Sequence, residues 1–321
     1  MMDTIARRGM PAAFALSAIL AGPAFAQDAG TLSLAPGIVV DSNRELAFAV
    51  APAGHAQAVV LADGRTLWSS SEPMLPLAIV DGRLLALSST RQPGLGMLLI
   101  VDPASGNALD RVAFDLPETV SAEFIPGPNR SFTAQIADAG DGVRLHWRHE
   151  SWPLRGAVVL DEDGGTDPRQ VESGAIDISF GGDRAYATPL REAVAPPASA
   201  SPAATSEEHL QGIPGVQYAA VDRAAILASV ALEDPAAGYR WTIHDRRSGR
   251  ALGALESSYA LAPFVVNGER LVYRAEAEGR LQPDGHWLSL ETRVVGYDLR
   301  AGRPLWSLAV HPMVFRGPMP P

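Results

Sequence analysis

The chain has 321 residues, a formal net charge of −10 and 47% hydrophobic residues, a composition typical of a globular protein. The acidic balance disfavours binding to nucleic acid or to an anionic membrane surface, because both attract basic faces. The chain contains no Cys and no Lys. These absences exclude disulfides, thiol nucleophiles, c-type haem attachment, a Walker A phosphate loop and a lysine Schiff base.

The first 26 residues are typical of a signal peptide. Arg7 and Arg8 form a basic start, and residues 10–20 are apolar apart from one Ser. The small-x-small sequence Ala24-Phe25-Ala26 follows, so we expect cleavage between Ala26 and Gln27. An uncleaved anchor is the alternative to a cleaved signal. Twin-arginine export is the alternative to the Sec route, which the Gly-Met-Pro after the arginines favours.

The mature chain, residues 27–321, is expected to form a single domain in the periplasm or outside the cell. No later segment approaches the roughly 20 apolar residues that a membrane-spanning helix needs. We therefore expect no transmembrane segment in the mature protein.

A short segment recurs along the chain. Each copy has an apolar run, a turn containing Asp and Gly, and a Leu three residues after that Gly. An apolar run indicates a buried strand, Asp favours a turn, and Gly supplies the positive φ that ends it. Each copy therefore predicts a β-hairpin whose Leu points into the core. Four copies are clear and a fifth is degraded: residues 59–68, 99–109, 242–252, 295–306 and 158–164.

In two copies a Trp follows the Leu, at Trp68 and Trp306. A large ring near an outer strand can bury substantial area against a neighbouring unit. We expect both rings to pack on the next repeat.

A second hairpin precedes three of the copies. Residues 77–87 and 264–273 read as strand, Asp-Gly or Asn-Gly turn, strand, and residues 216–232 are a looser example. Two hairpins in tandem make a four-stranded unit, and repeats of about 40 to 55 residues are typical of propeller blades.

Residues 107–244 separate the second and third clear copies and have room for two or three further blades. Strands are expected at residues 132–137, 143–147, 157–160 and 175–180, and a Pro/Ala/Ser-rich loop at 192–207. The sequence therefore predicts an all-β fold, a β-propeller of six or seven four-stranded blades. Two stacked β-sandwiches are the alternative, although they do not predict the repeated turn motif.

The segment from Asp298 to Trp306, Asp-Leu-Arg-Ala-Gly-Arg-Pro-Leu-Trp, resembles the repeat of pyrroloquinoline-quinone (PQQ)-like propellers, the quinoprotein alcohol dehydrogenase superfamily. The turn from Asp102 to Gly106 is similar to that of surface-layer-type propellers. The resemblance covers four or five short stretches, and outer-membrane assembly scaffolds share the repeat. It implies PQQ and calcium only where an adjacent Cys pair lies against the quinone. Because this chain has no Cys, we expect no cofactor, with PQQ or calcium as the alternative.

Two stretches are candidate sites. His146 and His149 suggest a metal or acid–base cluster, but residues three apart on a strand point to opposite faces. A solvent-facing hairpin with one buried Trp is the preferred interpretation. The turn containing Asp161, Asp163 and Asp167 offers alternating carboxylates, which suit calcium, although such turns are also common without an ion.

No nucleophile elbow, His-Glu-x-x-His helix or dinucleotide fingerprint occurs in the sequence. A strong scaffold repeat without a catalytic signature favours a non-catalytic protein that binds a periplasmic or envelope protein. The alternatives are a PQQ- or calcium-dependent oxidoreductase or propeller hydrolase, and a small-molecule or sugar binder.

Overall fold

The computed structural model describes residues 31–35, 37–125, 130–139, 142–151, 170–181, 184–189, 216–222, 224–234, 238–275, 279–281, 287–289 and 291–311. These residues form strands and no helix, which confirms the predicted all-β class. The predicted signal peptide, the fifth repeat copy and the Pro/Ala/Ser-rich loop lie outside the described residues.

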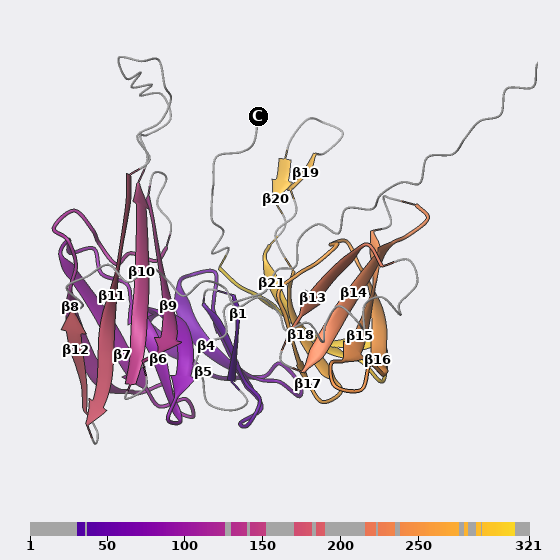
Figure 1. The fold of residues 1–321 in the computed structure, drawn as a ribbon, viewed down its shortest axis with the longest axis horizontal. Coiled ribbons are helices and arrows are strands. Elements are labelled where there is room, and N and C mark those ends of the chain that lie inside the picture. Colours follow the sequence, from indigo (N-terminus) through magenta and orange to yellow (C-terminus); the bar gives the residue numbers. More distant parts are fainter. Residues whose placement is uncertain are drawn as a thin grey trace, which may run out of the picture.

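The strands build antiparallel sheets that follow one another along the chain (Figure 1). Sheet 1 contains β2 (Ile38–Asp41), β3 (Leu46–Val50), β4 (His55–Val60) and the first half of β5 (Thr66–Val80), with β1 (Thr31–Ala35) added beside β2. Sheet 2 contains the second half of β5, then β6 (Arg83–Ser88), β7 (Leu95–Val101) and β8 (Ala108–Asp115).

Three further sheets of four strands follow. Sheet 3 contains β9 (Arg130–Asp138), β10 (Gly142–Ser151), β11 (Gln170–Gly181) and β12 (Arg184–Pro189). Sheet 4 contains β13 (Tyr218–Val221), β14 (Ala225–Ala231), β15 (Tyr239–Asp245) and β16 (Ala251–Ser257). Sheet 5 contains β17 (Phe264–Asn267), β18 (Arg270–Ala275), β21 (Arg293–Asp298) and β22 (Arg303–Ala309); between β18 and β21 the chain forms the hairpin of β19 (Gly279–Leu281) and β20 (Trp287–Ser289).

The four clear repeat copies are hairpins, as predicted. Each joins the third and fourth strands of its sheet, and the motif glycine has a φ between 67° and 75° in every copy. The Asp carboxylates accept backbone N–H groups inside the turns: Asp102 from Ala104 at 3.0 Å, Asp245 from Ser248 at 2.7 Å and Asp298 from Ala301 at 2.8 Å. The local chemistry of the motif therefore determines the turn.

The prediction for the motif leucines is wrong. At Leu67, Leu109, Leu252 and Leu305 the outer strand carries one residue more than its partner, so each Leu lies in a β-bulge. The extra residue leaves the regular alternation of faces, and the Leu turns away from the core. Leu67 and Leu109 are 41% and 57% exposed.

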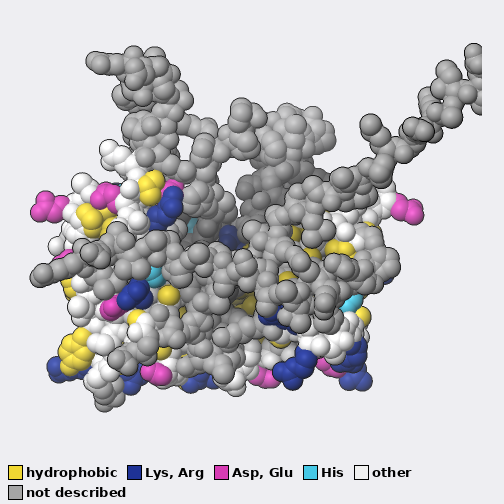
Figure 2. Space-filling model, viewed as in Figure 1, with side chains coloured by type: hydrophobic (Ala, Val, Ile, Leu, Met, Phe, Trp, Pro, Cys, Tyr) yellow, Lys and Arg dark blue, Asp and Glu magenta, His cyan; other side chains and the backbone are white. Residues whose placement is uncertain are grey.

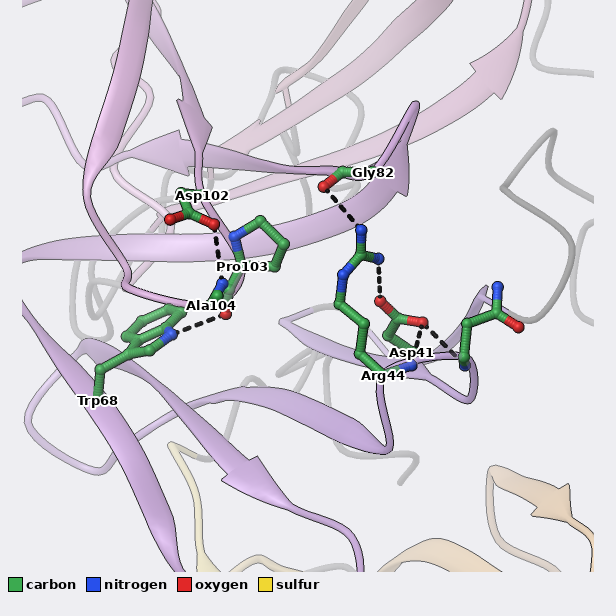
Figure 3. A network of polar contacts seen from close by, with 8 residues as sticks. Asp41, Arg44, Trp68, Gly82, Asp102, Pro103 and Ala104 are labelled. Carbon is green, nitrogen blue, oxygen red and sulfur yellow. Dashed lines mark hydrogen bonds and ion pairs between the residues drawn. The ribbon is translucent and has the colours of Figure 1, made fainter.

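The residue after each bulge contacts the next sheet. The indole Nε1 of Trp68, in sheet 1, donates to the Pro103 carbonyl in the turn of sheet 2 at 2.9 Å (Figure 3). In the same way, Trp306 of sheet 5 donates to the Leu61 carbonyl of sheet 1 at 2.8 Å. A Cβ on Gly64 or Gly106 would collide with these rings, so glycine is needed where each ring covers a turn. The predicted packing of both Trp rings on a neighbouring repeat is confirmed.

The other two copies use smaller residues at the same position. Asp110 of sheet 2 accepts the backbone N–H of Ala185 in sheet 3 at 2.9 Å. Gly253 of sheet 4 lies directly against Leu299 in the turn of sheet 5. The sheets are therefore linked in the spatial order 4–5–1–2–3.

Buried apolar clusters join the same neighbours. Separate clusters lie between sheets 4 and 5, 5 and 1, 1 and 2, and 2 and 3. Among the described residues, no such cluster joins sheet 3 to sheet 4.

A buried aspartate adds a polar link between sheets 1 and 2 (Figure 3). Asp41 is fully buried and accepts the backbone N–H groups of Asn43 and Arg44 at 3.0 and 3.2 Å. Its second oxygen accepts the Arg44 guanidinium at 2.6 Å, and that guanidinium also donates to the Gly82 carbonyl at 3.3 Å. Asp41 thus positions Arg44 across the junction.

Candidate functional site

The two edges of the sheets carry very different connections. At one edge, here called the turn edge, connections of two to six residues join the strands; the repeat turns are among them. At the opposite edge, the loop edge, strands begin and end around the much longer intervals 116–129, 152–169, 190–217 and 276–292 (Figure 1). Binding residues concentrate on long connections held by a rigid scaffold, so the loop edge is the candidate site.

Charged and polar side chains meet at the loop edge of sheets 2 and 3. The Glu123 carboxylate accepts Arg91 Nε at 3.2 Å and also pairs with Arg130. Beside it, Thr119 Oγ1 donates to Glu172 Oε1 at 2.9 Å. These five residues, the loop-edge polar cluster, tie the segment after β8 to the ends of β9 and β11.

The predicted solvent-facing hairpin at residues 146–150 is only partly correct. Trp147 is buried and stacks on Phe132 with ring centroids 6.1 Å apart, as expected for the one buried Trp. However, His149 is 6% exposed and Glu150 is 1% exposed, so both faces of β10 are covered near the loop edge. The strand geometry places His146 and His149 on opposite faces, which is why they do not form a shared ion site.

The environment of His149 favours the neutral imidazole. Burial lowers the pKa of His149 below its ordinary value of 6.5; Arg130 acts in the same direction, whereas Glu172 opposes them. His149 lies between Phe132 and Glu172 on the neighbouring strands. In the unfolded chain the imidazole binds a proton at higher pH than in the folded protein.

His149 should therefore make the protein less stable in acid. Its contribution is fully present above pH 6.5 and is lost as the pH falls towards the lower pKa of the folded state. We expect His149→Gln to reduce the loss of stability between about pH 7.5 and about pH 5.5, measured by urea unfolding. His146 and His311 also have pKa values lowered by burial, so part of the acid sensitivity should remain. An unchanged pH dependence in the variant would contradict this assignment.

A second group of buried polar side chains lies at the loop edge between sheets 1 and 5. The backbone N–H of Val310 donates to the Thr292 carbonyl at 2.9 Å, and that of His311 donates to Val50 at 2.8 Å. Thr292 is 1% exposed, and Thr292 Oγ1, His55 Nδ1 and His311 Nδ1 are buried without a hydrogen-bond partner in the described structure. No motif marks these residues, so sequence reasoning missed them.

The calcium candidates Asp161, Asp163 and Asp167 lie outside the described residues. The strands that flank them, β10 and β11, meet the loop edge beside the polar cluster. Within the described ranges, no group of three or more His, Asp or Glu side chains is arranged to hold a metal ion. The described part of the chain also contains no helix with the length and apolarity to cross a bilayer.

No protein-family model matches the chain, and no curated protein matches it. Three solved structures are similar to it at low identity. The Dos1 propeller is 11% identical, with 86% of this chain and 68% of that chain covered and a TM-score of 0.28. A europium-containing methanol dehydrogenase is 12% identical (83% and 60% covered, TM-score 0.26), and Hsv2 from Kluyveromyces lactis is 9% identical (83% and 75% covered, TM-score 0.24). Because these TM-scores are below 0.5, the description of the fold depends on the sheets and their contacts alone.

Proposed function

We propose that the protein is an exported, non-catalytic β-propeller scaffold that binds a protein partner in the periplasm through its loop edge. Three features support the propeller. The four-stranded sheets are consecutive, a repeated hairpin ends four of them, and the residue after each bulge contacts the next sheet in order. The signal-peptide pattern of residues 1–26 supports export.

We infer that the five described sheets are the blades, fewer than the six or seven that the repeat spacing predicts. Residues 152–169 connect two strands of sheet 3. The 28 residues between β12 and β13 include the Pro/Ala/Ser-rich stretch 192–207, which leaves too few for four paired strands. Sheets 3 and 4 would then face each other across this interval.

The contrast between the two edges is the observation that carries the binding function. Short turns of two to six residues close one edge, while every connection of 14 residues or more belongs to the other. At that edge, Arg91 and Arg130 share one carboxylate, and the Arg91 side chain is 88% exposed. An exposed guanidinium can exchange its intramolecular ion pair for one with a partner.

Site-specific photo-crosslinking in cells that export the protein tests this proposal. A photoreactive residue in place of Gln92, exposed at the loop edge, should give a discrete adduct with a partner protein. Arg91→Glu should weaken that adduct about fivefold, because it reverses an exposed charge beside the crosslinking position. A photoreactive residue in place of Ala113, exposed on β8 away from both edges, is the matched control and should give no adduct.

Failure to obtain any adduct from Gln92, or equal adducts from both positions, would contradict binding through the loop edge. Amino-terminal sequencing of the recovered protein is a separate test of export and should begin at Gln27.

A further inference from the structure

The turn edge carries a regular set of arginines that the proposed function does not use. In three of the four repeat copies the residue after the motif glycine is Arg: Arg65 in sheet 1, Arg250 in sheet 4 and Arg303 in sheet 5. In sheet 2 the equivalent residue is Asn107. All four residues are exposed or largely exposed, and Figure 2 shows Arg side chains along the lower side of the molecule, where the turn edge lies.

These arginines lie on sheets that are neighbours in space. Gly253 of sheet 4 packs against Leu299 of sheet 5, and Trp306 of sheet 5 packs against the turn of sheet 1. The repeat therefore places Arg250, Arg303 and Arg65 at equivalent positions on three consecutive sheets. We call these three residues the turn-edge arginine row.

The carboxylates of the same turns face inward. Asp245 accepts two backbone N–H groups and the Ser248 hydroxyl, and Asp298 accepts two backbone N–H groups. The guanidinium groups face the solvent instead. Arg250 and Arg303 form no ion pair with any described residue, and Arg65 is 3.9 Å from Asp63 with its side chain 65% exposed.

The local charge is opposite to that of the whole protein. The three turns contain six arginines (Arg65, Arg246, Arg247, Arg250, Arg300 and Arg303) and three aspartates (Asp63, Asp245 and Asp298), a net formal charge of +3 in a chain of −10. Glu269 lies 3.9 Å from Arg300 and offsets part of this charge. A guanidinium binds a carboxylate through two parallel hydrogen bonds, so a spaced row of them suits a chain with several carboxylates.

We propose that the turn-edge arginine row is a second binding surface, which takes an acidic segment of a partner protein. An acidic segment contacts the row alone, whereas an extended anionic membrane would also face the net negative remainder of the protein. This surface lies at the edge opposite to the proposed loop-edge site, so the two can fail independently.

Fluorescence anisotropy with a labelled polyglutamate peptide tests the proposal on the purified protein. The double variant Arg250→Gln/Arg303→Gln should bind the peptide about tenfold more weakly, because it removes two exposed ion-pairing groups. The matched control Arg91→Gln/Arg184→Gln removes two exposed arginines elsewhere and should bind like the unaltered protein. Asn107→Arg adds a fourth arginine at the equivalent position of sheet 2 and should strengthen binding.

Absence of peptide binding, or equal losses in the row variant and the control, would overturn the proposal. Binding to phosphatidylglycerol vesicles without binding to polyglutamate would also overturn it and would assign the row to a lipid surface. High salt should abolish peptide binding in the unaltered protein, since exposed charges are screened.

Discussion

Trp306→Ala should destabilise the protein by about 3–5 kcal/mol, the usual cost of truncating a large buried aromatic side chain. Trp306 is 9% exposed, packs against Gly64 and Gly296, and donates its indole N–H to Leu61. It is the contact through which the last described sheet holds the first. Chemical denaturation followed by circular dichroism measures the change in the free energy of unfolding.

Two variants separate the ring from its hydrogen bond and from the outer strand in general. Trp306→Phe keeps an aromatic ring but removes the N–H donor, so it should cost less than Trp306→Ala, with about 1 kcal/mol due to the lost hydrogen bond. Leu109→Ala removes a bulge leucine that is 57% exposed and should change stability by less than about 0.5 kcal/mol. Equal effects of Trp306→Ala and Leu109→Ala would show that the sheets are not held together at this contact.

Asp41→Ala should destabilise the protein by about 2–4 kcal/mol. The substitution leaves two backbone N–H groups without their acceptor and releases the Arg44 guanidinium from a buried carboxylate. The Arg44 side chain is 38% exposed, so water can solvate part of the released charge and limits the loss. Arg44 would then also lose its position over Gly82 of sheet 2.

Asp63→Ala is the matched control for this prediction, because Asp63 also accepts a backbone N–H in a turn of sheet 1 but is 59% exposed. It should cost less than about 1 kcal/mol by thermal or urea unfolding. If Asp63→Ala costs as much as Asp41→Ala, burial of Asp41 and its bridge to sheet 2 are not what matters.

The parts of the fold determined by neighbouring residues were predictable from the sequence. The Asp and Gly of each repeat turn act within a few residues, and the structure contains the four hairpins where the motif lies. The Asp81-Gly82 and Asn267-Gly268 turns were predictable for the same reason. In sheet 3, where the motif is absent, apolar alternation still located β9, β10 and β11, although each extends beyond the predicted segment.

The features that depend on distant residues were not predictable. A β-bulge is a mismatch between two strands, and nothing in Gly-x-x-Leu alone shows that the Leu is the extra residue. The loop-edge polar cluster brings together Arg91, Glu123 and Arg130 from three separate stretches of chain. The burial of Glu150 is likewise a consequence of packing, because a charged residue on a strand normally indicates the solvent side.

The bulges also bear on how molecules of this protein behave towards one another. The outermost strand of a sheet presents unpaired backbone groups that can pair with a strand of another molecule, which is a common start of aggregation. In four of the sheets described here, the outer strand is interrupted by a bulge directly after the repeat turn. A bulge twists the edge and breaks its regular hydrogen-bonding register, so a second molecule cannot extend the sheet smoothly. The same short motif that builds each hairpin thus protects the concentrated protein from edge-to-edge association.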